Sequence, residues 1–204
     1  MSFVALIDYD MGNLLSVSKA LESVGADLRI VRSPIEAKTA SALILPGVGN
    51  FGDGMKHLRQ SQFIPFIKDW IAADKPFLGI CLGMQMLMES SEEAPEVEGL
   101  GIFSGKVVRF PAHSLKVPHI GWNTLEVQNN SPYFQGLSPL PWFYFVHSYY
   151  VQPNNSAIVA AKTNYIVDFA AALSRGNLLA TQFHPEKSQE NGLSVLQHFI
   201  KRIQ

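Results

Sequence analysis

The sequence predicts an α/β protein with a mixed, mostly parallel central sheet flanked by helices. In the first half, short apolar runs alternate with segments whose apolar residues have helical spacing. In the second half, apolar runs follow one another with only turn residues between them. Strands that alternate with helices favour parallel pairing, and consecutive strands favour an antiparallel extension. We expect that extension in the C-terminal half, within a single domain that spans residues 1–204.

The first half contains the alternation. Leu14, Val17, Leu21 and Val24 recur at helical spacing before Gly25, a residue that often ends a helix. A glycine-rich loop is expected at Pro46–Gly54. The predicted strands are Phe3–Asp8, Asp27–Val31, Ala42–Leu45 and Phe77–Ile80, and the predicted helices are Gly12–Gly25, Phe63–Ala73 and a helix that starts over Leu82–Met88.

The second half reads as a succession of strands closed by a helix. Arg175-Gly-Asn177 between two apolar runs is a hairpin signal, which predicts antiparallel pairing there. The predicted strands are Ile102–Phe110, Trp122–Val127, Phe143–Tyr150, Ala157–Thr163, Ala170–Ser174 and Leu178–Phe183, and the predicted helix is Gly192–Ile203.

Composition excludes several classes of function. The formal net charge is −1 and no long basic run is present, so nucleic-acid binding has little electrostatic support. No run of eighteen apolar residues appears, so no membrane span is expected, and the first residues resemble a strand more than a signal peptide. Because Cys81 is the single cysteine, an internal disulfide and a multi-cysteine metal site are excluded. We expect a cytoplasmic protein with no metal and no cofactor.

Cys81 lies in the segment Gly79-Ile-Cys-Leu-Gly83, between a predicted strand and a predicted helix. This is the Gly-x-nucleophile-x-Gly pattern of a strand-to-helix elbow, in which side chains at the flanking positions would clash. The elbow presents the nucleophile at the carboxyl ends of the strands, and the start of a helix favours thiolate over thiol. The alternative is a buried cysteine that only packs in the core.

A thiolate nucleophile needs a proton shuttle, and His184 is the main candidate. It follows the strand predicted at Leu178–Phe183, and Glu186 is two residues away and able to orient the imidazole. His147, at the end of another aromatic strand, is the rival base. Taken alone, a histidine near a glutamate is more often an ordinary turn, so the cysteine elbow carries this interpretation.

Attack on a carbonyl creates an oxyanion, which requires backbone N–H donors. The N–H of Leu82 is one candidate, and the loop Pro46-Gly-Val-Gly49 offers another. A competing interpretation uses the same loop, since Gly47–Gly52 matches the G-x-G-x-x-G nucleotide-binding pattern. That pattern is weak here, because it follows the third strand and its acidic partner would be Asp69 or Asp74.

Three motifs together resemble those of the class I, triad-type glutamine amidotransferases: PGVG at 46–49, GICLGMQ at 79–85 and HPEKS at 184–188. The resemblance covers nearly the full chain. The opening IDYDMGNLLS, the segment IGWN at 120–123, VHSYY at 146–150 and Lys187 are similar to the glutaminase subunits that serve histidine biosynthesis. Asp10 stands where these subunits usually have glycine.

The resemblance implies a flavodoxin-like fold and a glutaminase site. Cys81 matches the nucleophile that forms a γ-glutamyl thioester with L-glutamine, His184 matches the general acid/base, and Glu186 matches its partner. The oxyanion N–H groups fall on Gly49 and Leu82. The residues that match the surroundings of glutamine are Gly47, Gln85, Glu89, His147, Ser148 and Tyr149.

The resemblance also implies a partner. In the family, ammonia passes to a (β/α)₈-barrel cyclase subunit, which makes imidazole glycerol phosphate and an aminoimidazole carboxamide ribotide. Asn13, Trp122 and Lys187 match the interface of this heterodimer. From the residues alone, Asn13 is equally a helix cap, Trp122 a core residue and Lys187 a solvated charge. The free subunit is expected to hydrolyse glutamine poorly, because the oxyanion hole is completed with the liganded partner.

Three other functions compete with this one. Another amidotransferase subunit, serving anthranilate or pyridoxal phosphate synthesis, shares the elbow but not Lys187 and the GWN segment. A cysteine peptidase or γ-glutamyl hydrolase would work without a partner. A nucleotide-binding module using Gly47–Gly52 would not need Cys81.

Overall fold

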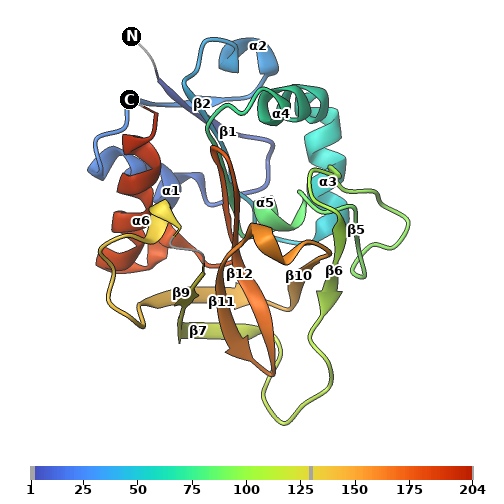
Figure 1. Ribbon diagram of the computed structural model, residues 1–204. Helices are drawn as coiled ribbons and strands as arrows, with labels where there is room; N and C mark the ends of the chain where they lie inside the picture. Colours follow the sequence, from blue (N-terminus) through green and yellow to red (C-terminus); the bar gives the residue numbers. More distant parts are fainter. Residues whose placement is uncertain (1–2, 129–130, 204) are drawn as a thin grey trace.

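The protein is described by a computed structural model over residues 3–128 and 131–203 (Figure 1). Its main sheet has eight strands in the order β2-β1-β3-β4-β13-β12-β11-β8. The first five pair in parallel and the last three antiparallel, which confirms the predicted fold class. The strands are, in sheet order, Leu28–Val31, Val4–Ile7, Ala42–Leu45, Phe77–Ile80, Leu178–Thr181, Val167–Arg175, Val159–Tyr165 and Glu126–Val127.

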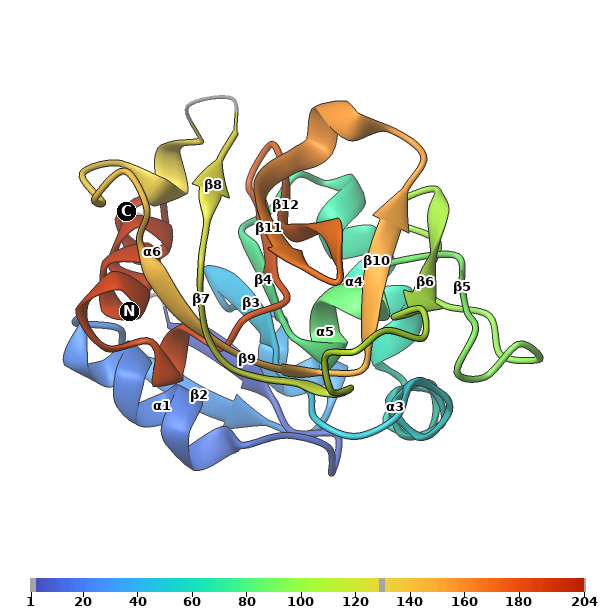
Figure 2. The same ribbon diagram turned by 90° about the horizontal axis from the view of Figure 1, so that it is seen from below.

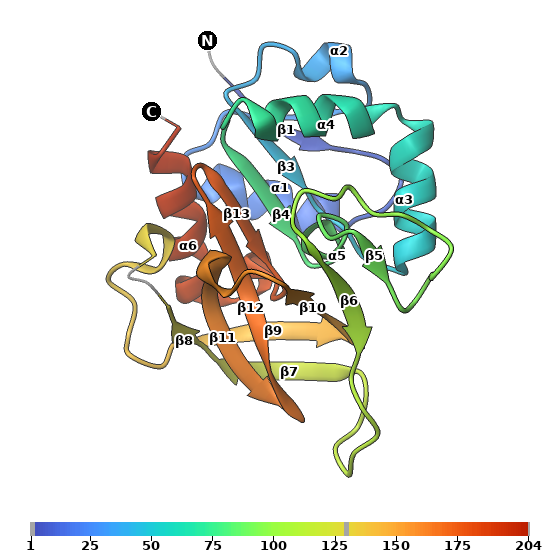
Figure 3. The same ribbon diagram turned by 45° about the vertical axis from the view of Figure 1, so that its right-hand side comes forward.

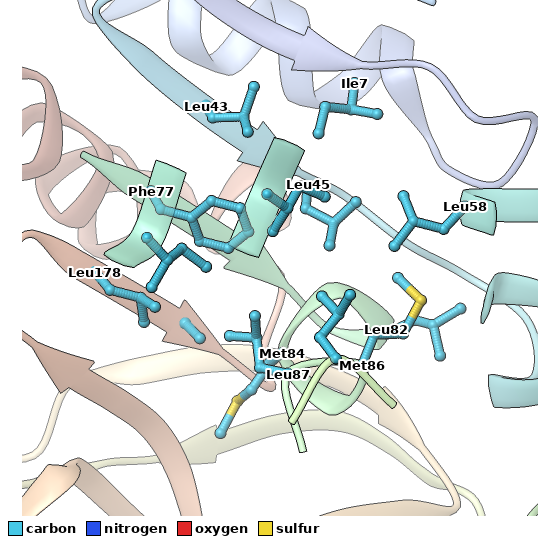
Figure 4. Close-up of a cluster of buried hydrophobic side chains, with 14 of the residues drawn as sticks. Ile7, Leu43, Leu45, Leu58, Phe77, Leu82, Met84, Met86, Leu87 and Leu178 are labelled. Atoms are coloured by element: carbon cyan, nitrogen blue, oxygen red, sulfur yellow. The ribbon is translucent and has the colours of Figure 1, made fainter. Parts of the chain in front are cut away.

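Helices cover both faces of the main sheet (Figures 1 and 3). Alternate residues of β1 point to opposite faces, so Leu6 packs in the cluster with α1 and α6 while Ile7 packs in the cluster with α3, α4 and α5. Figure 4 shows part of the second cluster, where Ile7, Leu45 and Leu82 lie among other buried hydrophobic side chains. The helices are α1 Leu14–Ser23, α2 Pro34–Ala37, α3 Phe51–Gln60, α4 Phe63–Ala72, α5 Leu82–Gln85 and α6 Gln189–Lys201.

Two small sheets are built beside the main one. Strands β7 and β9 form an antiparallel pair that lies across the end of the main sheet where β4 meets α5 (Figures 2 and 3). Strand β10 continues from β9 and pairs with β6, which pairs with β5. The bounds are β5 Ser90–Ser91, β6 Gly105–Arg109, β7 His119–Thr124, β9 Trp142–His147 and β10 Tyr149–Pro153, with short 3₁₀ turns η1 Pro132–Phe134, η2 Ser156–Ile158 and η3 Pro185–Lys187.

Two predictions for the first half were wrong at their ends. The loop expected at Pro46–Gly54 stops at Asn50, whose side chain accepts the Asp53 N–H at 2.8 Å and caps α3. The helix expected over Leu82–Met88 ends at Gln85. The carbonyls of the next three residues are taken by N–H groups of residues 100–103, so tertiary contacts replace the helical hydrogen bonds. The sequence prediction missed α2, α3 and β5 altogether.

In the second half, two predicted strands are each divided. The strand expected at Phe143–Tyr150 changes partner at Ser148, pairing with β7 before it and with β6 after it. The strand expected at Trp122–Val127 likewise splits into β7 and β8, which belong to different sheets. The predicted hairpin is present, because β12 and β13 pair antiparallel around Gly176, which has a φ of +56°.

Candidate active site

The chain motifs singled out above converge on one pocket at the carboxyl ends of the parallel strands. It has a volume of about 270 Å³. Such strand ends are where open α/β sheets place their sites. The lining residues are Val48, Gly49, Cys81, Leu82, Gln85, Glu93, Pro118, Val146, His147, Ser148, Tyr149 and His184.

Cys81 sits on a strained elbow between β4 and α5. Its φ is +54°, in a region that non-glycine residues rarely adopt, and its N–H donates to the Thr181 carbonyl at 2.7 Å. A Cβ on Gly83 would lie 2.0 Å from the Leu45 carbonyl oxygen, and one on Gly79 would lie 3.0 Å from the Gly83 carbonyl oxygen. The chain therefore has no room for a side chain at Gly83 and little room for one at Gly79.

The helix that follows Cys81 is shorter than the sequence suggests. Because α5 has four residues, its macrodipole is that of a single turn. It therefore stabilises a Cys81 thiolate only through the few N–H groups of that turn. The first N–H of any helix has no intrahelical acceptor, so the Leu82 N–H at the pocket wall is available to a bound oxyanion.

His184 is held by Glu186 through its ring and by Ser188 through its backbone carbonyl. Nδ1 lies 2.8 Å from Glu186 Oε1, and both side chains are almost fully buried. The Ser188 hydroxyl donates to the His184 carbonyl and accepts the Tyr144 N–H, which fixes the turn η3 against β9. Nε2 of His184 has no hydrogen-bond partner within residues 3–128 and 131–203. The ring is thus oriented by Glu186 and keeps its other nitrogen for chemistry.

The electrostatics of His184 favour its charged form. Burial lowers its pKa, but the nearby charge of Cys81 and the hydrogen bond and charge of Glu186 together act more strongly in the other direction and raise the pKa to about 10. An imidazolium beside a thiolate is the resting state expected of a cysteine–histidine pair.

His147, the rival base, has both ring nitrogens occupied. Nδ1 lies 2.8 Å from the Tyr149 carbonyl oxygen, which only accepts, so Nδ1 carries the proton. Nε2 lies 3.0 Å from Nδ1 of His119 and therefore accepts from it. Burial lowers the pKa of His147 to about 3 and that of His119 to about 4. His147 is a neutral, fixed wall of the pocket.

The loop Pro46–Gly49 packs directly on the elbow. A Cβ on Gly47 would lie 2.8 Å from the Leu82 Cβ and 2.7 Å from the Tyr9 hydroxyl oxygen, so only glycine fits there. The Tyr9 hydroxyl donates to the Pro46 carbonyl at 2.8 Å, and burial raises the pKa of this phenol, as does the nearby Cys81 charge. Gly49 lines the pocket with a φ of +102°.

The predicted glutamine-binding residues divide into two groups. Gln85, His147, Ser148 and Tyr149 line the pocket. Glu89 is exposed, lies outside the lining and accepts the Gly105 N–H at 2.9 Å instead. Glu93 lines the pocket and was missed by the sequence interpretation, since only its place in an acidic stretch marks it. The remaining residue, Gly47, lies outside the pocket lining and packs against Leu82 and Tyr9.

Two of the predicted interface residues, Trp122 and Lys187, lie beside the same Tyr144 ring, and the third, Asn13, lies at the start of α1. Asn13 caps α1, with its side chain accepting the Ser16 N–H at 3.3 Å, as the alternative interpretation held. Trp122 is 43% exposed on β7, which rules out simple core packing. Lys187 is exposed, with its Nζ 5.8 Å from the centre of the Tyr144 ring. Asp10 has a φ of +65°, in the left-handed region that glycine adopts without steric cost.

The nucleotide-binding interpretation of Gly47–Gly52 loses one of its two candidate acidic partners. Asp74 lies at the opposite end of β4 from Cys81, where its carboxylate accepts hydrogen bonds from the Asn177 backbone and side-chain amides. Among the described residues there is no cluster of three or more potential metal ligands. Within the same residues, no helix has the length and apolarity needed to cross a membrane.

Comparison with known proteins defines the class of protein. The family model for class I glutamine amidotransferases matches residues 5–203, so the chain belongs to that family. Two solved structures share the fold, a glutamine amidotransferase (TM-score 0.79, 22% identity, 99% of each chain) and PurLQS from Thermotoga maritima (TM-score 0.79, 19% identity, 100% of this chain and 99% of that one).

Within the family, the chain belongs with the HisH subunits of imidazole glycerol phosphate synthase. The subunit from Cyanothece sp. (strain PCC 7425) is 50% identical over 100% of this chain and 97% of its own length. The subunit HisH 1 from Methanococcus maripaludis is 45% identical over 98% of this chain and its full length. That of Thermosynechococcus vestitus is 50% identical over 98% and 97%, respectively. These relatives confirm the resemblance seen in the sequence.

Proposed function

We propose that this chain is a glutaminase subunit that hydrolyses L-glutamine through Cys81, His184 and Glu186. The observation that carries the proposal is their arrangement around one pocket. Cys81 stands on a strained elbow, and His184 is bonded to Glu186 at 2.8 Å with Nε2 left unpartnered among the described residues. The names of the relatives support the same activity and place it in imidazole glycerol phosphate synthase.

In the first half-reaction, the Cys81 thiolate attacks the carboxamide carbon of glutamine. The carbonyl oxygen becomes an oxyanion, for which the Leu82 N–H and the Gly49 N–H are the proposed donors. When the intermediate collapses, the C–N bond breaks and the His184 imidazolium gives its proton to the departing nitrogen. The products of this step are ammonia and a γ-glutamyl thioester on Cys81.

In the second half-reaction, neutral His184 takes a proton from water as the oxygen attacks the thioester carbon. The C–S bond then breaks, which releases glutamate and restores the thiolate and the imidazolium. Glu186 orients the ring and stabilises its charge throughout. Around the substrate we place Gln85, His147, Ser148 and Tyr149, with Glu93 in the place first given to Glu89.

The partner is proposed to be a (β/α)₈-barrel cyclase subunit that receives the ammonia. The HisH name of the relatives identifies a subunit of a complex, and a face with exposed Trp122 and Trp142 on the β7–β9 pair suits docking. Asn13, Trp122 and Lys187 remain the proposed contacts. A cytoplasmic location belongs to the same proposal, because it follows from the biosynthetic role of the relatives.

The test is glutamate release from glutamine by the wild-type chain and by Cys81→Ala, with and without the barrel cyclase and its nucleotide ligand. We expect turnover that requires both Cys81 and the liganded partner, and no detectable turnover by the variant. Equal turnover without the partner would indicate an independent γ-glutamyl hydrolase. Turnover that survives Cys81→Ala would overturn the assignment of the nucleophile.

A further inference from the structure

A second glutamine side chain, Gln182, lies beside the reactive sulfur. It directly follows β13, two residues before His184, and is 0% exposed. Its Nε2 lies 3.7 Å from Cys81 Sγ, within the longer hydrogen-bond range of sulfur. A buried amide is costly unless it is hydrogen-bonded, and the residues on either side, Thr181 and Phe183, are fully buried as well. Packing alone therefore gives no reason for an amide at this position.

The Tyr149 backbone carbonyl determines the orientation of the side-chain amides of Gln85 and Gln182. The Tyr149 carbonyl oxygen only accepts, so the Gln85 group 3.0 Å away from it must be the NH₂. The second hydrogen of that NH₂ then points to Gln182 at 3.1 Å, which must present Oε1. With Oε1 turned to Gln85, the NH₂ of Gln182 has to face the sulfur.

We propose that Gln182 is a further catalytic residue, which donates a hydrogen bond to the Cys81 thiolate and is oriented for this by Gln85. A donor to a charged acceptor stabilises the charge, so it favours thiolate over thiol. The same bond stabilises the sulfur as leaving group when the thioester is hydrolysed. This inference rests on the proposed function, because it takes Cys81 as the nucleophile.

Other groups also act on the sulfur and stay in place in the test variants. His184, in the segment after β13, and Tyr9, in the segment after β1, interact with the charge of Cys81. His147 and Glu93 line the same pocket. Glu186 acts through His184. The measured quantity is the pH midpoint of Cys81 alkylation, compared between variants in which His184 is unchanged.

The experiment measures the rate of alkylation by iodoacetamide against pH in the full-length chain, which is specific because Cys81 is the single cysteine. Gln182→Met keeps the length of the side chain and removes the donor. We expect its alkylation midpoint to rise by about one pH unit and turnover with the partner to fall about tenfold, mainly in kcat. Gln182→Glu places a carboxylate at the sulfur and should raise the midpoint further.

The control is Thr181→Val, which removes a buried hydroxyl one residue away whose bond goes to the Phe183 carbonyl. Its midpoint should equal that of the wild type. Folded Gln182→Met and Gln182→Glu proteins with an unchanged midpoint would overturn the inference, as would equal shifts in all three variants. If Gln182→Met does not fold, Gln182→Glu decides alone. Failure of the proposed function is seen separately, as turnover that survives Cys81→Ala.

Discussion

Two histidines border the same pocket and are held in opposite charge states. His184 has a carboxylate on one nitrogen and a thiol site near the other, and its pKa rises to about 10. His147 has a carbonyl on one nitrogen and His119 on the other, and burial lowers its pKa to about 3. Both rings are buried to a similar extent. Burial lowers the pKa of both rings, and the charges of Cys81 and Glu186 around His184 account for the difference between them.

The comparison separates a residue that moves protons from one that shapes the site. A base must have a free nitrogen within reach of the substrate, which His184 has. The hydrogen bonds through the His119–His147 pair all run in one direction. The Asn123 amide donates to His119, His119 donates to His147, and His147 donates to the Tyr149 carbonyl. Each nitrogen in this series has a defined role, and the whole series of bonds forms when both rings are neutral.

The largest effect is expected from His184→Asn, compared with the same substitution at His147. Asparagine in place of His184 removes the proton donor and acceptor, so turnover with the partner should fall about 1,000-fold, mainly in kcat. Asparagine in place of His147 retains a donor near the position of Nδ1, and the loss should be about tenfold or less. Glutamate release by each complex measures both. Equal losses would mean that His147 also transfers protons.

Much of the fold follows from the sequence because local patterns and tertiary structure agree. Val4 to Ile7 alternate between two buried clusters, and the strand appears where the apolar run predicts it. The prediction failed where distant chain segments take over the hydrogen bonds. Residues 86–88 leave the helical pattern because residues 100–103 bond to their carbonyls, and no local signal marks that event.

The parts of the candidate site built from residues close together in the sequence were predictable. Its contacts between residues far apart in the sequence were not. Gly79 and Gly83 are spaced as an elbow requires, and His184 and Glu186 are two residues apart, so both features are visible in the sequence. The contact between Gln182 and Cys81 spans 101 positions and has no such spacing. The place of Glu93 in the pocket was unpredictable for the same reason, because its carboxylate is held by the N–H of Phe51, 42 positions away, at 2.7 Å.

The neutral pair should make the fold sensitive to acid. In the unfolded chain, His119 and His147 take up protons near pH 6.5, whereas in the fold they do so only near pH 4 and 3. The unfolded state therefore binds more protons below pH 6.5, and the free energy of unfolding falls as pH falls, by at most about 1.4 kcal/mol per pH unit for each histidine. His184 acts in the opposite sense, since its stabilisation is present below pH 6.5 and is lost as pH rises toward 10.

Urea unfolding at pH 7.5, 6.5 and 5.5 measures this slope. His119→Phe removes one titrating ring and keeps the stacking between Phe145 and Tyr165, so its slope between pH 6.5 and 5.5 should be shallower than that of the wild type. His113→Phe is the matched control, because His113 is exposed and its removal should leave the slope unchanged. Identical slopes for His119→Phe and the wild type would show that His119 does not titrate as proposed.

The smallest and most local test changes the group at the far end of the pair. Nδ2 of Asn123 lies 3.4 Å from His119 Nε2 and can only donate to it, which favours the neutral ring. Asn123→Asp replaces that donor with a negative charge, so the pKa of His119 should rise by about 1–2 units from its value of about 4. Titration of the His119 ring by NMR measures the shift, and Asn123→Ala, which loses the same side-chain bonds without adding charge, should give a smaller one. A protonated His119 still donates through Nδ1 to His147, so turnover should change less than in His184→Asn or His147→Asn. An equal rise of the His119 pKa in both Asn123 variants would instead mean that solvent access, and not the bonded group, sets the charge of this ring.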